Sequence, residues 1–258
     1  MTKSLFYAAL ALSLAGLPAG ATAQTPARTT AVQPAGVQPA GVQPAALQRL
    51  DAERACLVMV DFTTGLYPIV QTIDTDEMLN NAVAAAKTAR LFELPILVLG
   101  DEGGFYGEMH PAVKSFAGAG QPFERTTPSA YASGGFRAAL EASGRTQVLI
   151  GGITTDNCTL LTSLDLLRAG YEVFVVTDIS GSDSEAAEEA ALARLRDAGA
   201  VTISWITIGS ELLDTWQTPE GASLTQIYGQ HMNGPITSRY GSTADDARMP
   251  SEAEADGN

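Results

Sequence analysis

Short apolar runs alternate with segments of helical periodicity along the middle of this chain, and this alternation limits its fold more than any other feature. The runs are continuously apolar, which is typical of strands buried on both faces of a parallel sheet. The segments between them place apolar residues at the three- and four-residue spacing of a helix. The pattern predicts an α/β fold: a three-layer α/β/α sandwich around a doubly wound, mostly parallel sheet.

Five strands and five helices follow from this pattern. The expected strands cover residues 56–60, 95–99, 147–150, 172–177 and 201–205. The expected helices cover residues 76–92, 135–142, 159–168, 184–197 and 210–216. Ser184 is a suitable helix cap, and Gly170 and Gly199 stand where two of the helices should end.

The first 23 residues predict a secretory signal peptide. Lys3 supplies the positive charge, Leu5 to Leu17 is uncharged and apolar, and Ala21-Thr22-Ala23 has the pattern of a cleavage site. The apolar stretch is shorter than the ~20 residues that span a bilayer. We therefore expect export, to the periplasm or the medium.

Two further segments lack the composition of a folded core. Residues 24–50 form a linker in which Val-Gln-Pro-Ala-Gly repeats, and proline at that density favours extended chain. Residues 226–258 read as a C-terminal arm followed by an acidic, disordered tail. The folded domain is expected between them, over residues 51–225.

Charge and cysteine content exclude some classes of function. The formal net charge is −14, which disfavours nucleic acids and anionic membrane surfaces because both are bound through clustered Lys and Arg. The two cysteines, Cys56 and Cys158, could pair in an oxidising compartment. We favour two free thiols, because Cys56 opens an apolar run where a cysteine acts as a small buried hydrophobe.

Two residues at strand ends are candidates for chemistry. Ligands of open α/β sheets bind at the carboxyl ends of the strands. Asp61 follows the first strand, and Cys158 follows a turn and begins a helix. A thiol at a helix N-terminus lies at the positive end of the backbone dipole, and free N–H groups there can hold an oxyanion. Spacing alone leaves a loop carboxylate and a packing cysteine equally open.

The wider motif resembles a known family. The residues that carry the resemblance are the strand ending in Asp61, Gly151 to Cys158, Ala169 to Val173 and Val176 to Asp178. They resemble the isochorismatase-like cysteine hydrolases over residues 53–240. The resemblance is nearest to the YcaC-like subgroup. The residues that carry this closer match are Gly65-Leu66, Asn80-Asn81, Glu211-Leu212, Trp216 and His231. The resemblance implies a sheet of six strands.

The family uses an Asp–Lys–Cys triad, which the resemblance carries onto this sequence. It implies that Asp61 is the general base and that Cys158 is a nucleophile forming a thioester. It also implies a cis peptide between Ile153 and Thr154, which with Cys158 would direct N–H groups at an oxyanion. The best match to the family lysine is Arg125, which keeps the charge but does not readily release a proton.

Other candidates concern binding. Thr63 stands where many relatives carry glutamine, and Phe105 and Tyr131 are candidate pocket residues. The two histidines, His110 and His231, are far apart, so we expect neither a metal nor a cofactor. Expected partners are a small-molecule substrate and copies of the same chain, as a tetramer or octamer, with residues 221–239 as an interface arm.

These features predict a cysteine hydrolase that acts on a small amide-like C–N bond. Two alternatives remain. Arginine in place of lysine is compatible with a catalytically inactive family member that serves as a binding or assembly protein. The family also contains enzymes that hydrolyse the vinyl ether of isochorismate-type substrates, a reaction that need not use the cysteine.

Overall fold

The computed structural model describes residues 45–100 and 103–232, so the predicted signal peptide, most of the linker and the acidic tail lie outside the described residues. Five parallel strands form one sheet in the order β2-β1-β3-β4-β5. They are β1 (Ala55–Val60), β2 (Ile96–Leu99), β3 (Gln147–Gly152), β4 (Glu172–Val176) and β5 (Val201–Ile203). The expected doubly wound α/β/α sandwich is confirmed.

The sheet has five strands in the described residues, and the sixth that the resemblance implies is reduced to a single bridge. Phe123 pairs in parallel with Leu99 at the outer edge of β2. Next to this bridge the side chain of Gln121 takes the place of a backbone partner, accepting from Val98 N at 2.7 Å and donating to Ile96 O at 3.4 Å. A side chain thus covers the edge where a sixth strand would continue.

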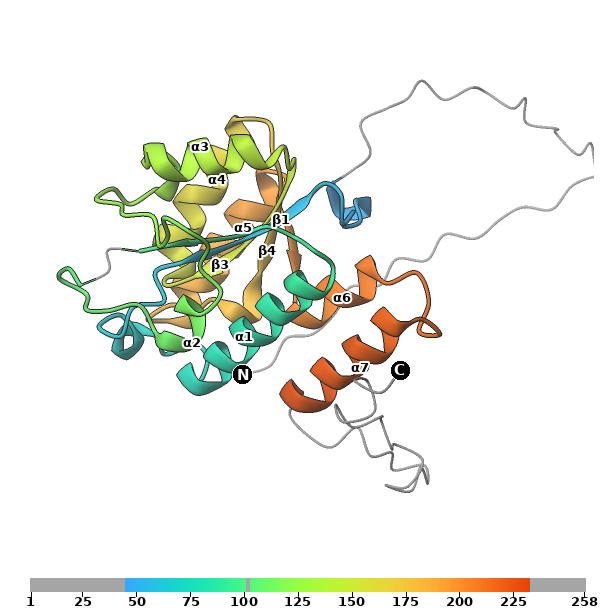
Figure 1. The fold of residues 1–258 in the computed structure, drawn as a ribbon. Helices are drawn as coiled ribbons and strands as arrows, with labels where there is room; N and C mark the ends of the chain where they lie inside the picture. The colour runs from blue at the N-terminus through green and yellow to red at the C-terminus, as the bar shows by residue number, and fades with distance from the viewer. Residues whose placement is uncertain (1–44, 101–102, 233–258) are drawn as a thin grey trace, which may run out of the picture. The chain divides into compact units, whose positions relative to one another are not determined.

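Helices cover both faces of the sheet (Figure 1). The longer helices are α1 (Thr75–Leu91), α3 (Gly134–Ser143), α4 (Leu160–Arg168), α5 (Glu185–Asp197), α6 (Trp205–Leu212) and α7 (Pro219–His231). The short ones are α2 (Pro111–Lys114), η1 (Ala45–Leu47), η2 (Tyr67–Ile69), η3 (Ala130–Ala132), η4 (Thr155–Thr159) and η5 (Thr177–Ile179). In the described residues, no helix is both long and apolar enough to cross a membrane.

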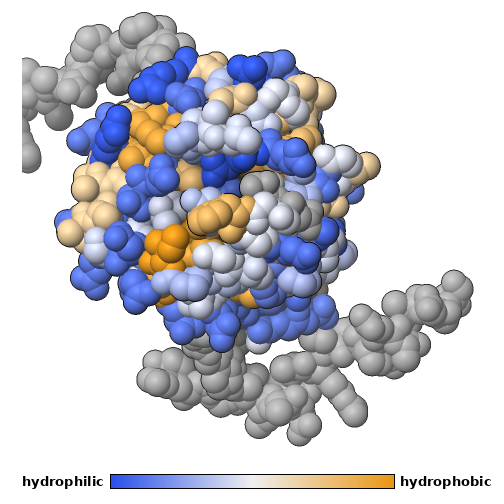
Figure 2. Space-filling model, turned by 90° about the vertical axis from the view of Figure 1, so that its left-hand side faces the viewer, coloured by the Kyte–Doolittle hydropathy of each residue, from blue (hydrophilic) through white to orange (hydrophobic). Residues whose placement is uncertain are grey.

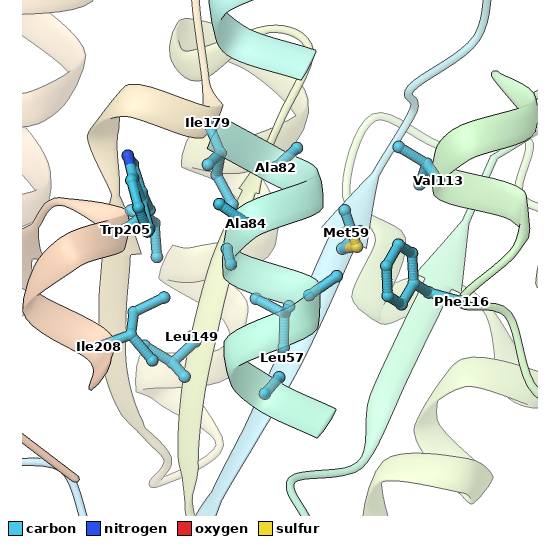
Figure 3. Packing of buried hydrophobic residues seen from close by; sticks show 14 of the residues in the cluster. Leu57, Met59, Ala82, Ala84, Val113, Phe116, Leu149, Ile179, Trp205 and Ile208 are labelled. Carbon is cyan, nitrogen blue, oxygen red and sulfur yellow. The ribbon is translucent and has the colours of Figure 1, made fainter. Parts of the chain in front are cut away.

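Two hydrophobic clusters lie on opposite faces of the sheet, because successive strand residues point to opposite sides. Leu57 and Met59 of β1 join the cluster under α1 and α6 (Figure 3). Cys56, Val58 and Val60 join the cluster under α3, α4 and α5. Burial on both faces explains why these strands read as continuous apolar runs.

One strand prediction and one helix prediction are wrong at the carboxyl end of the domain. Trp205 was expected to end a strand, but β5 stops at Ile203 and Trp205 begins α6. The expected helix over 210–216 ends at Leu212, and a further helix, α7, follows. The domain boundary expected after residue 225 falls inside α7.

Residues of α1 hold the end of α7. Asn80 Nδ2 donates to His231 O at 2.8 Å, and His231 Nδ1 lies 2.8 Å from Asn80 Oδ1. Lys87 Nζ lies 2.8 Å from His231 Nε2. Burial, and then the charge of Lys87, lower the pKa of His231, so this ring is neutral at neutral pH. Part of the segment expected as an interface arm is therefore tied to its own domain.

Candidate active site

The predicted site residues lie where the order of the sheet reverses. Strand β1 lies between β2 and β3, so chain connections leave it in both directions. Ligands bind beside the carboxyl ends of strands at such a point. Asp61 directly follows β1, and Cys158 follows β3 after a short turn. Asp61 and Cys158 thus flank this point.

Asp61 is buried and held in an unusual backbone conformation. Its φ is 58°, in the left-handed region that side chains other than glycine rarely adopt. Only 3% of the residue is exposed, and its N–H donates to Leu99 O at 2.9 Å. A strained residue persists where the surrounding structure fixes it, and such residues cluster at functional sites.

Arg125, which is itself a predicted catalytic residue, contacts both Asp61 and Cys158. Its Nε donates to Asp61 Oδ1 at 2.9 Å, and its Nη2 pairs with Asp61 Oδ2. The same Nη2 donates to Cys158 Sγ at 2.8 Å. Nη1 donates to the carbonyls of Thr127 and, at 3.3 Å, Pro128. A guanidinium has five N–H donors, and these contacts engage all of them.

Cys158 lies in η4, a π-helical turn at the start of α4. It is a free thiol and 8% exposed, so the disfavoured disulfide with Cys56 is absent. The peptide between Ile153 and Thr154, just before this turn, is cis. Hydrogen bonds from a cation stabilise negative charge on an acceptor, so the contact from Arg125 suits a thiolate.

Two glycines and a network of side chains fix the turn that carries Cys158. Gly152 N donates to Ser180 Oγ at 3.0 Å, and Gly152 O accepts from Thr159 Oγ1 at 3.2 Å. A Cβ on Gly151 would lie 2.3 Å from Ile179. On the other side of the turn, Thr155 Oγ1 donates to Glu188 Oε1 on α5 at 2.9 Å. The position of the thiol is therefore set by the residues of η5 and its end, and by α5, as well as by β3.

A cavity of about 780 Å³ opens onto these residues. Its lining consists of Asp61, Thr63, Leu66, Ile69, Tyr106, Arg125, Thr126, Thr127, Pro128, Ile153, Thr154, Asp156, Asn157, Cys158 and Asp183. Figure 2 views the molecule from the side to which the carboxyl ends of the strands point, where apolar patches lie among hydrophilic residues. All the predicted catalytic and oxyanion residues meet in this cavity.

The three predicted substrate-binding residues differ in their placement. Thr63 lines the cavity, is 1% exposed, and its Oγ1 has no hydrogen-bond partner. Phe105 is 89% exposed and does not line the cavity, whereas its neighbour Tyr106 does. Tyr131 packs against the cluster under α3 instead. No sequence pattern indicates where these aromatic rings lie relative to the sheet.

Cys56 and the two histidines do not line the cavity. Burial raises the pKa of the Cys56 thiol to about 12, so it is protonated at neutral pH. His110 Nδ1 accepts from Ala112 N at 3.2 Å and caps α2. Across residues 45–100 and 103–232, no three His, Cys, Asp or Glu side chains are grouped to hold a metal ion.

Comparison with known proteins decides the family. Residues 55–207 match the isochorismatase domain, which is more than half of the chain. The chain belongs to the isochorismatase family. The probable hydrolase YcaC of Escherichia coli is 33% identical over 187 residues, which are 71% of this chain and 89% of YcaC. The chain is thus a family hydrolase, and the predicted likeness to the YcaC-like subgroup is confirmed.

Solved structures agree with this assignment. YcaC from Pseudomonas aeruginosa has a TM-score of 0.67 and 34% identity, with coverage of 72% of this chain and 93% of that one. YcaC from Escherichia coli has a TM-score of 0.68 and 30% identity, with coverage of 71% and 91%. The structure of the latter is described as an octameric hydrolase of unknown specificity.

Proposed function

We propose that this chain is a cysteine hydrolase that cleaves a small amide-like C–N bond without a metal. One observation carries the proposal: Arg125 contacts both Asp61 and Cys158 in the same cavity. A nucleophile and a carboxylate that both lie within hydrogen-bond reach of one cation, in one cavity, bring together the groups that nucleophilic catalysis needs.

The first half-reaction forms a thioester. Asp61 takes the thiol proton of Cys158, and the sulfur attacks the carbonyl carbon of the amide. The negative charge moves to the carbonyl oxygen, and the N–H groups of Thr154 and Cys158 are the proposed donors to it. The C–N bond then breaks, and the leaving nitrogen takes the proton from Asp61. The amine departs and the acyl group remains on sulfur.

The second half-reaction frees the enzyme. Asp61 takes a proton from water, and the resulting hydroxide attacks the thioester carbonyl. The C–S bond breaks, and the proton held by Asp61 returns to the sulfur. Arg125 stays protonated throughout, since a guanidinium does not give up its proton in proteins. Its part is to hold the carboxylate and stabilise the thiolate rather than to transfer a proton.

Two relatives and the N-terminal sequence of this chain support three further parts of the proposal. The YcaC structure from Pseudomonas aeruginosa contains covalent acrylamide, so that protein reacts with a small amide electrophile. The octamer of the Escherichia coli protein supports a homo-oligomer, tetramer or octamer, here; a monomer mass by light scattering would contradict it. The first 23 residues support export, which N-terminal sequencing of the mature protein tests.

Trapping the acyl-enzyme tests the proposed reaction. We expect a panel of small amides, nitriles and esters to contain a substrate whose acyl mass appears on the intact protein after a rapid acid quench. Peptide mapping should locate this mass on Cys158. If no panel member is turned over and Cys158 reacts slowly with thiol reagents at neutral pH, the chain is an inactive binding protein, as arginine at position 125 would allow.

Replacing Arg125 with lysine tests whether the guanidinium is fitted to this site. Lysine has three donors and no planar fork, so it cannot serve Asp61, Cys158 and the carbonyls of Thr127 and Pro128 together. We expect kcat/KM to fall by about tenfold or more, since paired charged hydrogen bonds are lost. An alkaline decline should also appear, because lysine loses its proton near pH 10.

Arg54→Lys is the matched control for this substitution. Arg54 pairs with Glu172 at the surface, where both side chains are partly exposed. Such pairs contribute little to stability, so activity and its pH profile should remain those of the unmodified protein. An Arg125→Lys enzyme that is faster, with no alkaline decline, would mean that arginine is a poor substitute for lysine here.

A further inference from the structure

The charge of the cavity wall limits what the cavity can bind. Four charged side chains line it: Asp61, Arg125, Asp156 and Asp183. Asp61 and Arg125 neutralise each other as an ion pair. The ion pairs of the described residues include no cation beside Asp156 or Asp183. The wall therefore carries two unbalanced negative charges.

The single cation of the wall has no donor left for a substrate. Its five N–H groups are engaged by Asp61, Cys158 and the carbonyls of Thr127 and Pro128. Arg125 is the only Lys, Arg or His among the residues that line the cavity in the described part of the chain. A carboxylate on a substrate would enter without a counter-ion, which is costly in a partly buried site.

The carboxylate of Asp156 also offsets the attraction that a helix N-terminus has for anions. Helix N-termini bind anions through their N–H groups and the positive end of the dipole. Asp156 lies in the first turn of η4, two residues before Cys158. Its Oδ1 accepts from Ser182 Oγ at 2.8 Å, which fixes the carboxylate beside the cavity. The negative charge is thus placed next to the reacting sulfur.

A second observation indicates a place in the cavity wall for a polar group of a ligand. Thr63 Oγ1 is buried in the wall and has no hydrogen-bond partner. Buried hydroxyls are normally paired, and an unpaired one needs an explanation. Leu66, Ile69 and Tyr106 supply an apolar part of the same wall. A ligand that satisfies Thr63 can therefore be largely apolar and need carry no negative charge.

We infer that the substrate is a small amide whose remaining part is cationic or uncharged, and that the site discriminates against carboxylates. Asp156 and Asp183 determine this selectivity. The identity of the scissile bond rests on the proposed function, but the charge selectivity does not. It also argues against the isochorismate-type alternative, because such substrates are anionic.

Thiol reagents of different charge measure this selectivity without requiring turnover. Three methanethiosulfonates of similar size are used, carrying a trimethylammonium, an uncharged or a sulfonate group. Their rates with Cys158 are followed by intact mass and divided by their rates with free cysteine. Cys56 is fully buried, so a single labelled thiol is expected.

We expect the corrected rates to follow the order cation, uncharged reagent, anion. The ratio of cation to anion should be about tenfold, or about threefold for each carboxylate at several ångströms in a partly solvated site. Asp156→Asn and Asp183→Asn should each lower the ratio about threefold, and added salt should lower it further. Asp183 is exposed, so its variant should fold even if the Asp156 variant does not.

Asp197→Asn is the control for net charge. Asp197 is exposed at the end of α5 and does not line the cavity, so the ratio should stay unchanged. Equal corrected rates, a faster anion, or the same decrease in the Asp197 variant would overturn the inference. The expected ratio together with an absence of amide turnover would contradict the proposed function and leave the charge selectivity standing.

Discussion

Replacement of Cys158 with alanine is expected to abolish amide turnover and the acyl adduct together. The variant keeps the Cβ but lacks the atom that forms the proposed thioester. Loss of a covalent nucleophile lowers kcat by about 10⁴-fold or more in enzymes of this type. Turnover is measured with the best substrate of the panel, and the adduct by intact mass after an acid quench.

The fold should tolerate this change. Cys158 is 8% exposed and lies at the edge of the cluster under α3, α4 and α5, where it also lines the cavity. A circular dichroism spectrum and melting temperature near those of the unmodified protein would show that only the chemistry was removed. Activity retained at more than a hundredth of the original would refute the thioester mechanism. Such a result would mean that the amide bond is cleaved without a covalent bond to sulfur.

Cys56→Ala is the matched control. It removes the other thiol from the start of β1, where the side chain is fully buried. Loss of a buried sulfur should lower stability by about 1 kcal/mol. Activity per folded molecule should be unchanged, because Cys56 is absent from the cavity wall. The pair of variants separates the loss of a reactive thiol from the loss of a packed one.

Much of the sheet was predictable from the sequence because its strands are buried on both faces. The continuous apolar run before Asp61 reflects β1, whose neighbours are β2 and β3. The strand-end position of Asp61 and the turn before Cys158 then placed both at the carboxyl edge. The proposed role of Arg125 came from the family resemblance. No local sequence pattern links Arg125 to Asp61, which is 64 positions away, or to Cys158, which is 33 positions away.

Other features depend on contacts that the local sequence does not encode. Val201 to Trp205 reads as a strand, but Trp205 N donates to Asp178 Oδ1 at 2.8 Å and a helix starts there. The left-handed backbone of Asp61 is set by its neighbours, since aspartate has no general need for it. The exposure of Phe105 depends on how a loop lies over the sheet. Each of these is a long-range effect.

Gly152 is the last residue of β3 and pairs with Val60, the last residue of β1. At this position φ is 148°, and a Cβ would lie 1.9 Å from Val60 O. The atom it would meet is backbone in the paired strand, so relief requires β1 and β3 to separate where Gly152 pairs with Val60. Asp61 and Cys158 follow these two strand ends. We expect Gly152→Ala to lose about 3 kcal/mol or more of stability and most of its activity.

Two other glycines separate the causes of this loss. Gly144 has a φ of 66° with nothing near its missing Cβ, so Gly144→Ala should cost only the conformational term, about 1–2 kcal/mol. Gly134 begins α3 in open space, and alanine there should leave stability equal or slightly higher. Denaturant unfolding ranks the three variants. If Gly152→Ala is no less stable than Gly144→Ala, the close approach of β1 and β3 does not fix the active site.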